Sequence, residues 1–328
     1  MKNVRLDSII LAVVVVSALA LSAAICAPQT EYAKGAGTIL HFPKDRSVGH
    51  LLLFNTRHDV APLKVFCAAR GDVEVPPKTN LGLKLSYAAI QDMTFLKNLD
   101  PSCLMLLDAS RLDIDDDRAF NVHYLTGLRT LNLNNTEIGD KGLQYVSNLK
   151  QLIRLDLGDT GVTGRGLVHL YGLQLEDLSL MHDRVGDDEL ASLEGMQHLR
   201  VLRLIGSGIG DKAMVHLAKM RGLFMLRLSS NRGITDAGIS HLLPLVNLDS
   251  LDLSETSVTP ACAKYLKALP KLKSLSISFH KYSPTEIAAF KASLPHVAVV
   301  DRMPVTHETT ELFAPLHSPI APQHDPSY

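Results

Sequence analysis

The sequence has no tryptophan, few aromatic residues and almost no net charge, and each shortage excludes a class of protein. Aromatic residues make up 5% of the 328 residues, which argues against base-stacking platforms and aromatic cages. The formal charge of −1 lacks the basic excess of a nucleic-acid-binding domain, so we expect no nucleic-acid partner. Four cysteines in so long a chain exclude a small disulfide-dense scaffold.

An apolar segment near the N-terminus indicates export. Lys2 and Arg5 precede an uncharged run from Ile9 to Ala27 that ends in small residues. This order is typical of a secretory signal peptide, and the run also has the length of a membrane anchor. Lipidation at Cys26 is a third option, which the bulky Ile25 disfavours. We predict that residues 1–27 are a signal peptide or an N-terminal membrane anchor. The protein would then be extracytoplasmic, either secreted or periplasmic, or held at the membrane by this segment alone.

Leucine, in contrast, is abundant and periodic. The chain has 55 leucines, and pairs of the form L-x-L recur every 23 to 25 residues, most of them with another leucine three residues ahead. The pairs are Leu131/Leu133, Leu155/Leu157, Leu178/Leu180, Leu202/Leu204, Leu226/Leu228, Leu251/Leu253 and Leu275/Ile277. A degenerate eighth unit places Leu104, Leu107, Leu112 and Ile114 in the same register. The pattern L-x-x-L-x-L at this period indicates the strand half of a leucine-rich repeat.

This pattern predicts an α/β solenoid. Alternate strand residues face opposite sides, so the leucines point into the core and the residues between them point outward. One unit cannot bury its leucines alone, and stacking on neighbouring units removes them from water. We therefore predict about eight 24-residue units over residues 104–282, with parallel strands on the concave face and short helices on the convex face.

A second column of residues repeats at the same period. Asp140, Asp187, Asp211 and Asp236 each precede a short helical stretch, such as residues 141–147. Aspartate is a favoured N-cap residue, so we expect each of them to cap its own helix. Thr163 and Thr259 are the expected caps in units that lack the aspartate. Because the acids keep one register, capping explains them better than a catalytic or calcium site.

The turn sequences carry a family resemblance. The stretch Thr136-Glu137-Ile138-Gly139-Asp140-Lys141-Gly142-Leu143 is echoed at residues 207–214 and 234–239. Here the chain resembles bacterial leucine-rich repeat proteins of the T-x-[IV]-x-D-x-G-L type, whose pattern is related to the cysteine-containing repeats of eukaryotic F-box proteins. The resemblance covers about residues 104–300 and implies a fold rather than a function. It also implies that residues 28–103 form a strand-rich N-terminal cap.

The C-terminal end has its own signals. Ser283 and Glu286 form a capping box around Pro284, which predicts a helical C-terminal cap over residues 283–300. Five prolines follow in residues 301–328, and we expect this tail to be disordered.

The sequence motifs predict no metal site, no cofactor and no enzymatic activity. Residues 113–117 have the first spacings of a calcium loop, but Arg118 occupies its glycine position and Tyr124 its glutamate position. The histidines form no evident ligand set. Cys67 and Cys103 both lie in the N-terminal cap region; they form a disulfide after export or remain two buried thiols.

The outward strand positions contain the candidate binding residues. Arg203 and Arg227 are neighbours in one column, and like charges side by side are unfavourable unless acids or an anion compensate. Arginines within apolar surface have the composition of a binding hot spot. The predicted concave binding residues are Arg203, Arg227, Met181, Val201, Ile205, Met225, Asp156 and Asp252. In the alternative, Asp177 and Asp252 neutralise the arginines and the surface binds nothing.

Three functions compete. The first is an exported, non-enzymatic interaction scaffold whose concave face binds a protein, peptide or glycan. The second is a substrate-recognition adaptor of the F-box type, which would need a helical domain before the array. The third is an enzyme with a site in residues 28–103, where Arg57, His58 and Asp59 are adjacent.

Overall fold

The computed structural model describes residues 37–56, 62, 64–280 and 282–301. The predicted export segment, the Arg57-His58-Asp59 cluster and the proline-rich tail after Asp301 lie outside the described residues. In the described part of the chain, no helix is both long and apolar enough to cross a membrane.

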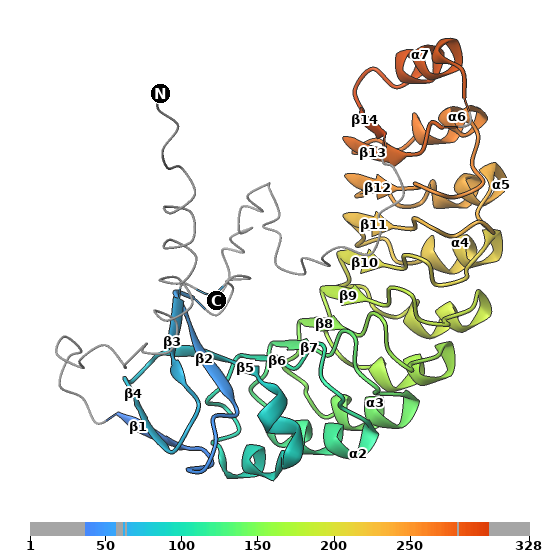
Figure 1. The fold of residues 1–328 in the computed structure, drawn as a ribbon. Helices are drawn as coiled ribbons and strands as arrows, with labels where there is room; N and C mark the ends of the chain where they lie inside the picture. The colour runs from blue at the N-terminus through green and yellow to red at the C-terminus, as the bar shows by residue number, and fades with distance from the viewer. Residues whose placement is uncertain (1–36, 57–61, 63, 281, 302–328) are drawn as a thin grey trace, which may run out of the picture.

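Most strands join a single curved sheet, and the helices lie along its convex side (Figure 1). Its 12 strands run in the order β14-β13-β12-β11-β10-β9-β8-β7-β6-β5-β2-β3, while β1 and β4 form a separate antiparallel pair. The first strands are β1 (Thr38–His41), β2 (Gly49–Phe54), β3 (Lys64–Ala68), β4 (Asp72–Val75) and β5 (Asn80–Leu85). The repeat strands are β6 (Leu106–Asp108), β7 (Thr130–Asn132), β8 (Arg154–Asp156), β9 (Asp177–Ser179), β10 (Val201–Arg203), β11 (Met225–Arg227), β12 (Ser250–Asp252), β13 (Ser274–Ile277) and β14 (Ala298–Asp301).

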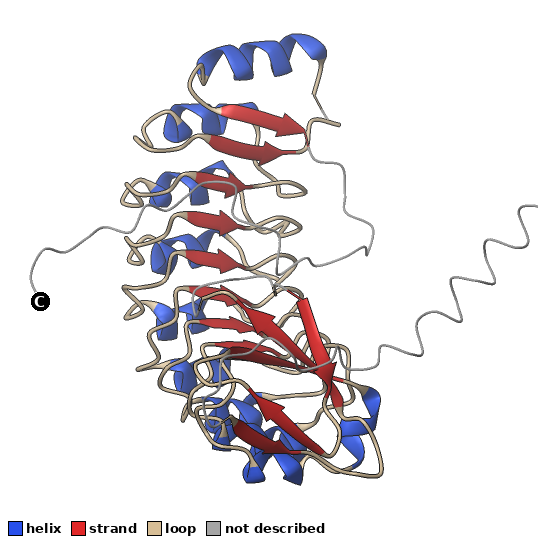
Figure 2. Ribbon diagram, turned by 90° about the vertical axis from the view of Figure 1, so that its left-hand side faces the viewer, coloured by secondary structure: helices blue, strands red, loops and turns tan. Residues whose placement is uncertain are grey.

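Short helices form the convex side, as the sequence predicts. The α-helices are α2 (Asp116–Ala119), α3 (Asp140–Val146), α4 (Asp211–Leu217), α5 (Asp236–Ile239), α6 (Ala263–Leu266) and α7 (Pro284–Ser293). The 3-10 helices are η1 (Tyr87–Gln91), η2 (Thr94–Asn98), η3 (Phe120–Tyr124), η4 (Gly164–Leu170), η5 (Asp188–Leu193), η6 (Ser240–Leu242) and η7 (Pro260–Cys262). Figure 2 shows the strands and helices as two layers along the array.

The parallel register confirms the predicted solenoid and extends it by one strand at each end. Positions 83, 107, 131, 155, 178, 202, 226, 251, 275 and 299 are partners across consecutive strands. Leu83 belongs to β5, in the predicted N-terminal cap, and Val299 belongs to β14, beyond the last predicted repeat. The predicted helical C-terminal cap therefore also contains a strand, and Asp301 belongs to that strand rather than to the tail.

The inward leucines form one continuous core. Leu131, Leu178, Leu202 and Leu226 are each fully buried. Each such side chain contributes about 1.5–3 kcal/mol when it leaves water. At the N-terminal end, β2 lies between β3 and β5 with antiparallel register on both sides, so the cap extends the repeat sheet without a break.

The aspartate column does not cap its own helices, contrary to our prediction. The carboxylate of Asp140 lies at the start of α3 but accepts hydrogen bonds from the backbone N–H and the hydroxyl of Thr163 in the next repeat, both at 2.7 Å. Asp211 binds Thr235 in the same way (2.7 and 2.6 Å). Asp236 binds Thr259 (2.8 and 2.5 Å). The aspartates therefore connect successive repeats.

The expected threonine caps are confirmed. The hydroxyls of Thr163 and Thr259 accept from the backbone N–H of Arg165 and Ala261 in the first turn of their own helices. At the other end of the array, Ser283 and Glu286 form the predicted capping box at the start of α7.

Candidate interaction face

The concave face consists of the outward-pointing residues of β6 to β13. The strands β6 to β13 lie side by side in the sheet (Figure 1). Because parallel strands lie about 4.8 Å apart, equivalent residues of successive repeats form columns of close neighbours. The central column contains Asp156, Arg203, Arg227 and Asp252, on β8, β10, β11 and β12. The sheet register pairs Arg203 with Arg227, as the sequence predicts.

Arg203 is held by an acid of the preceding strand. Its guanidinium makes two hydrogen bonds to the carboxylate of Asp177, the second of them 3.4 Å between Nη2 and Oδ2. Only 11% of the Arg203 side chain and 17% of the Asp177 side chain are exposed. Asp177 compensates the charge of Arg203, as the alternative interpretation of the arginine pair predicted.

Arg227 lies beside Asp252, its register partner on β12. Asp252 is 6% exposed, and its Oδ1 accepts hydrogen bonds from the backbone N–H of Ser254 (3.1 Å) and from the Ser254 hydroxyl (2.8 Å). The Arg227 side chain is partly exposed. The arginine column therefore has acids on both sides, with Asp177 next to Arg203 and Asp252 next to Arg227.

Apolar side chains surround the arginines, but not all those we predicted reach solvent. Met181, Ile205 and Met225 are partly exposed. Val201 is 5% exposed, because Asp177 and Met225 lie on either side of it in the sheet. The accessible part of the predicted patch is therefore Met181, Ile205, Met225 and the two arginines.

Asp156 is buried below the concave surface rather than displayed on it. The residue is 1% exposed, and its Oδ1 accepts from the backbone N–H of Gly158 at 3.0 Å. Burial raises the pKa of its carboxyl to about 6, against the opposing effect of the Gly158 hydrogen bond. Both buried acids of the predicted set, Asp156 and Asp252, thus shape the face from beneath and offer little surface to a ligand.

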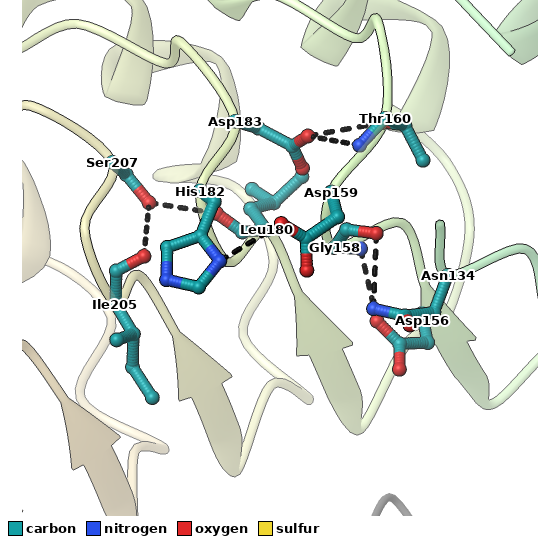
Figure 3. A network of polar contacts seen from close by, with 10 residues as sticks. All are labelled: Asn134, Asp156, Gly158, Asp159, Thr160, Leu180, His182, Asp183, Ile205 and Ser207. Carbon is teal, nitrogen blue, oxygen red and sulfur yellow. Dashed lines mark hydrogen bonds and ion pairs between the residues drawn. The ribbon is translucent and has the colours of Figure 1, made fainter. Parts of the chain in front are cut away.

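The turns after β8 and β9 contain a polar network that sequence reasoning missed (Figure 3). Asp183 is 1% exposed and accepts through Oδ1 from the Thr160 backbone N–H (2.9 Å) and hydroxyl (3.1 Å). Among the described residues, its Oδ2 has no hydrogen-bond partner. Burial raises the pKa of Asp183 to about 8. Beside it, Nδ1 of His182 lies 2.9 Å from Oδ1 of Asp159.

These turns share one backbone conformation. The residues after the strands adopt left-handed backbone conformation, with φ of 57° at Asp159 and 60° at His182. Such values are uncommon without glycine. Gly206 is the equivalent residue in the next repeat, and it is the glycine that this conformation favours (φ 62°). The turns that contain the network therefore share their backbone conformation with the equivalent turn of the next repeat.

The other sequence candidates have structural roles. Asp115 caps α2, and Asp116 accepts hydrogen bonds from the backbone N–H groups of Gly139 and Gly142 at 2.8 and 2.9 Å. Within the described residues, no group of three or more histidine, cysteine or acidic side chains is arranged to hold a metal ion.

The structure does not contain the Cys67–Cys103 disulfide that we considered. Cys103 is a partly buried free thiol. Its burial raises the pKa to about 12.

One family model matches part of this chain, and several solved structures are similar to it. The Leucine Rich repeat family model matches residues 125–147. No curated protein matches the chain. An internalin of Listeria monocytogenes is 21% identical, with a TM-score of 0.46, over 67% of this chain and 58% of its own. Internalin C2 of the same organism is 21% identical, with a TM-score of 0.40, over 50% of this chain and 84% of its own.

A leucine-rich repeat protein of Leptospira interrogans is 17% identical, with a TM-score of 0.45, over 64% of this chain and 56% of its own. This chain therefore spans little more than half the length of that protein and of the first internalin. The parallel register and the family match define a leucine-rich repeat solenoid. Solenoids of this kind present extended concave surfaces to partners.

Proposed function

We propose that this protein is an exported, non-enzymatic scaffold that binds a protein or peptide through the concave face of its solenoid. The observation that carries the proposal is the partly exposed group of Met181, Ile205, Met225 and Arg227 around the Arg203–Asp177 pair. Methionine and arginine are enriched in protein interfaces, and this group supplies both without a tryptophan or tyrosine.

The pairing of Arg203 shapes the proposed chemistry. Because the guanidinium of Arg203 is already bound to Asp177, the Arg203 side chain is held rigidly at the base of the patch. Arg227 is partly exposed, and we propose that it meets a carboxylate of the ligand, since arginine suits planar carboxylates. Apolar contact with Met225 and Ile205 would then supply much of the affinity.

We also propose that the protein belongs to the T-x-[IV]-x-D-x-G-L group. The aspartate–threonine links between repeats support this, because they use the D position of the pattern to bind the following turn. No observation favours an F-box-type adaptor: described residues before the array form strands and two short 3-10 helices rather than a helical domain. Export rests on the sequence pattern of residues 1–27.

The test is affinity capture from the envelope and secreted fractions of the source organism. The immobilised protein is compared with the Met225→Ala and Arg227→Ala variants, and with Val168→Ala on the convex helix η4 as the matched control. We expect the wild type and the control to capture a partner. Each of the two concave variants should capture at least tenfold less of it. Capture that all variants retain equally would place the binding surface elsewhere.

A further inference from the structure

One junction between repeats lacks the aspartate link that its neighbours have. In the repeats of β6 to β12, a carboxylate near the start of the helix accepts from a backbone N–H of the following repeat. The residues that form this link are Asp116, Asp140, Asp187, Asp211 and Asp236. The repeat of β8 has Gly164 at the same register position. In this described part of the array, the link is therefore missing between β8 and β9, which we call the β8/β9 junction.

Close packing of the next repeat explains the glycine. A side chain at Gly164 would place its Cβ 2.0 Å from the carbonyl oxygen of Val185 and 2.3 Å from Cβ of Glu189. Gly164 instead donates its backbone N–H to the carbonyl oxygen of Arg184 at 3.2 Å. No carboxylate fits at this position, so the β8/β9 junction cannot form the link that Asp140 forms one repeat earlier.

A buried acid makes a polar contact across the β8/β9 junction instead. Asp183 accepts from the backbone N–H and the hydroxyl of Thr160 in the preceding turn (Figure 3). Ser207, the equivalent residue one repeat later, donates its hydroxyl to the carbonyl oxygen of Leu180 at 2.7 Å. A carboxyl group can donate in this way only when it is protonated. Ionisation of Asp183 would therefore leave a buried charge on a group whose Oδ2 has no hydrogen-bond partner among the described residues.

The surroundings of Asp183 oppose its ionisation. Burial raises its pKa to about 8, with smaller contributions in the same direction from Asp159 and Asp156 in the repeat of β8. His182 and Arg184 flank it in sequence and are exposed, and His182 is already bound to Asp159. All residues of the turn after β10 are described, and none of them is titratable. No cation thus offsets the burial of this carboxyl.

Opening of the β8/β9 junction would remove this constraint. Once Asp183 is in water, its pKa returns toward the ordinary value of 3.8. Between these two pKa values the open form releases a proton that the closed form retains, so the open form becomes more favourable as the pH rises.

We propose that the array opens at the β8/β9 junction, and that ionisation of Asp183 drives the opening. Each repeat of a solenoid contacts only its neighbours, so a junction that lacks a link is where the array separates into blocks. The candidate binding residues Met181, Ile205, Met225 and Arg227 all lie in the C-terminal block. Opening would thus move the N-terminal cap relative to these residues and leave their own arrangement intact. The proposal does not depend on what the concave face binds.

The test is hydrogen exchange of the full-length protein, followed by mass spectrometry at pH 5 and pH 7 and corrected for the intrinsic effect of pH. The N–H groups of Leu157 and Asp159 donate across the β8/β9 junction. Those of Leu204 and Gly206 donate across the next but one junction, between β10 and β11, at the same register positions. At pH 7, we expect the first pair to be at least tenfold less protected than the second. From pH 5 to pH 7, the first pair should lose at least tenfold in protection.

Three variants make the test specific. Asp183→Asn keeps a donor and an acceptor in place of the protonated acid, so it should abolish the pH dependence at Leu157 and Asp159. Asp113→Asn, at an exposed acid, should leave it unchanged. Asp211→Ala removes the link between the repeats of β10 and β11, and it should lower the protection of the second pair by at least tenfold.

Two results would overturn the proposal. Equal protection of the two pairs of amides in the wild type at pH 7 would show that the array does not open at the β8/β9 junction. This comparison needs no variant to fold. A pH dependence at Leu157 and Asp159 that Asp183→Asn leaves unchanged would show that another group drives the opening.

Discussion

Asp140 and Thr163 are 23 residues apart in sequence and joined by two hydrogen bonds of 2.7 Å, from the threonine N–H and hydroxyl to the aspartate carboxylate. The same threonine hydroxyl accepts from the Arg165 N–H in the first turn of η4. The Thr163 side chain thus binds the aspartate of the preceding repeat and also caps the helix of its own repeat. This arrangement recurs at Asp211–Thr235 and Asp236–Thr259, so it is a property of the repeat.

Removal of this link should destabilise the array. Hydrogen bonds to charged groups contribute about 1.5–3 kcal/mol, so we expect Asp140→Ala to lower the free energy of unfolding by about 2 kcal/mol in urea titrations followed by circular dichroism. Asp188→Ala is the control, because Asp188 is an exposed aspartate in the first turn of η5; its effect should stay within about 0.5 kcal/mol. Equal effects of the two variants would contradict the role of the link.

The glycine of the D-x-G pattern makes room for the same carboxylate. A methyl group at Gly166 would collide with Oδ1 of Asp140, and one at Gly238 would collide with Oδ1 of Asp211. We expect Gly166→Ala to cost about 1–3 kcal/mol of unfolding free energy. In a double-mutant cycle with Asp140→Ala, the losses should be less than additive by at least about 1 kcal/mol. Additive losses would show that the glycine serves another purpose.

The buried carboxyl of Asp183 should make stability depend on pH. Its pKa is raised by burial from 3.8 to about 8, so between these values the folded protein retains a proton that the unfolded chain releases. The contribution is fully present below about pH 4 and is lost as the pH rises toward 8.

Asp183→Asn mimics the protonated acid and should therefore raise the unfolding free energy at pH 8 relative to the wild type by about 1.4 kcal/mol or more, and by much less at pH 4.5. The measurement is the difference in urea unfolding between the two proteins across this range. Asp113→Asn, at an exposed acid, should show no such difference. A wild-type slope that Asp183→Asn does not change would contradict the assignment.

Removal of only one partner of the Arg203–Asp177 pair should lower the free energy of unfolding. Asp177→Ala leaves a mostly buried guanidinium without its acid, and we expect a loss of about 2 kcal/mol in unfolding free energy. The double variant Asp177→Ala with Arg203→Met should recover most of this loss, because no unpaired charge remains. Lys273→Ala removes a lysine that is 76% exposed from its pair with Asp249, and it should cost less than about 1 kcal/mol. A double variant as unstable as Asp177→Ala would contradict this interpretation.

The leucine period predicted the array because each L-x-L pair packs inside its own repeat and against the next one. This contact is local, so the spacing of the leucines along the sequence is enough to predict it. The aspartate prediction was wrong because the partner of Asp140 lies one repeat away, and the same preference of aspartate for free N–H groups is satisfied there. The burial of Val201 and Asp156 could not be predicted either, because it depends on side chains of adjacent strands. Asp183 had no sequence signal beyond its place after a strand.

We propose that the concave face of this solenoid binds a ligand. The most direct measurement is the amount of partner captured from envelope and secreted fractions by the wild type and by Arg227→Ala, with Val168→Ala on the convex side as reference. We expect capture by the wild type and by Val168→Ala, and at least tenfold less capture by Arg227→Ala, with the unfolding midpoint of this variant unchanged. Full capture by Arg227→Ala would contradict it.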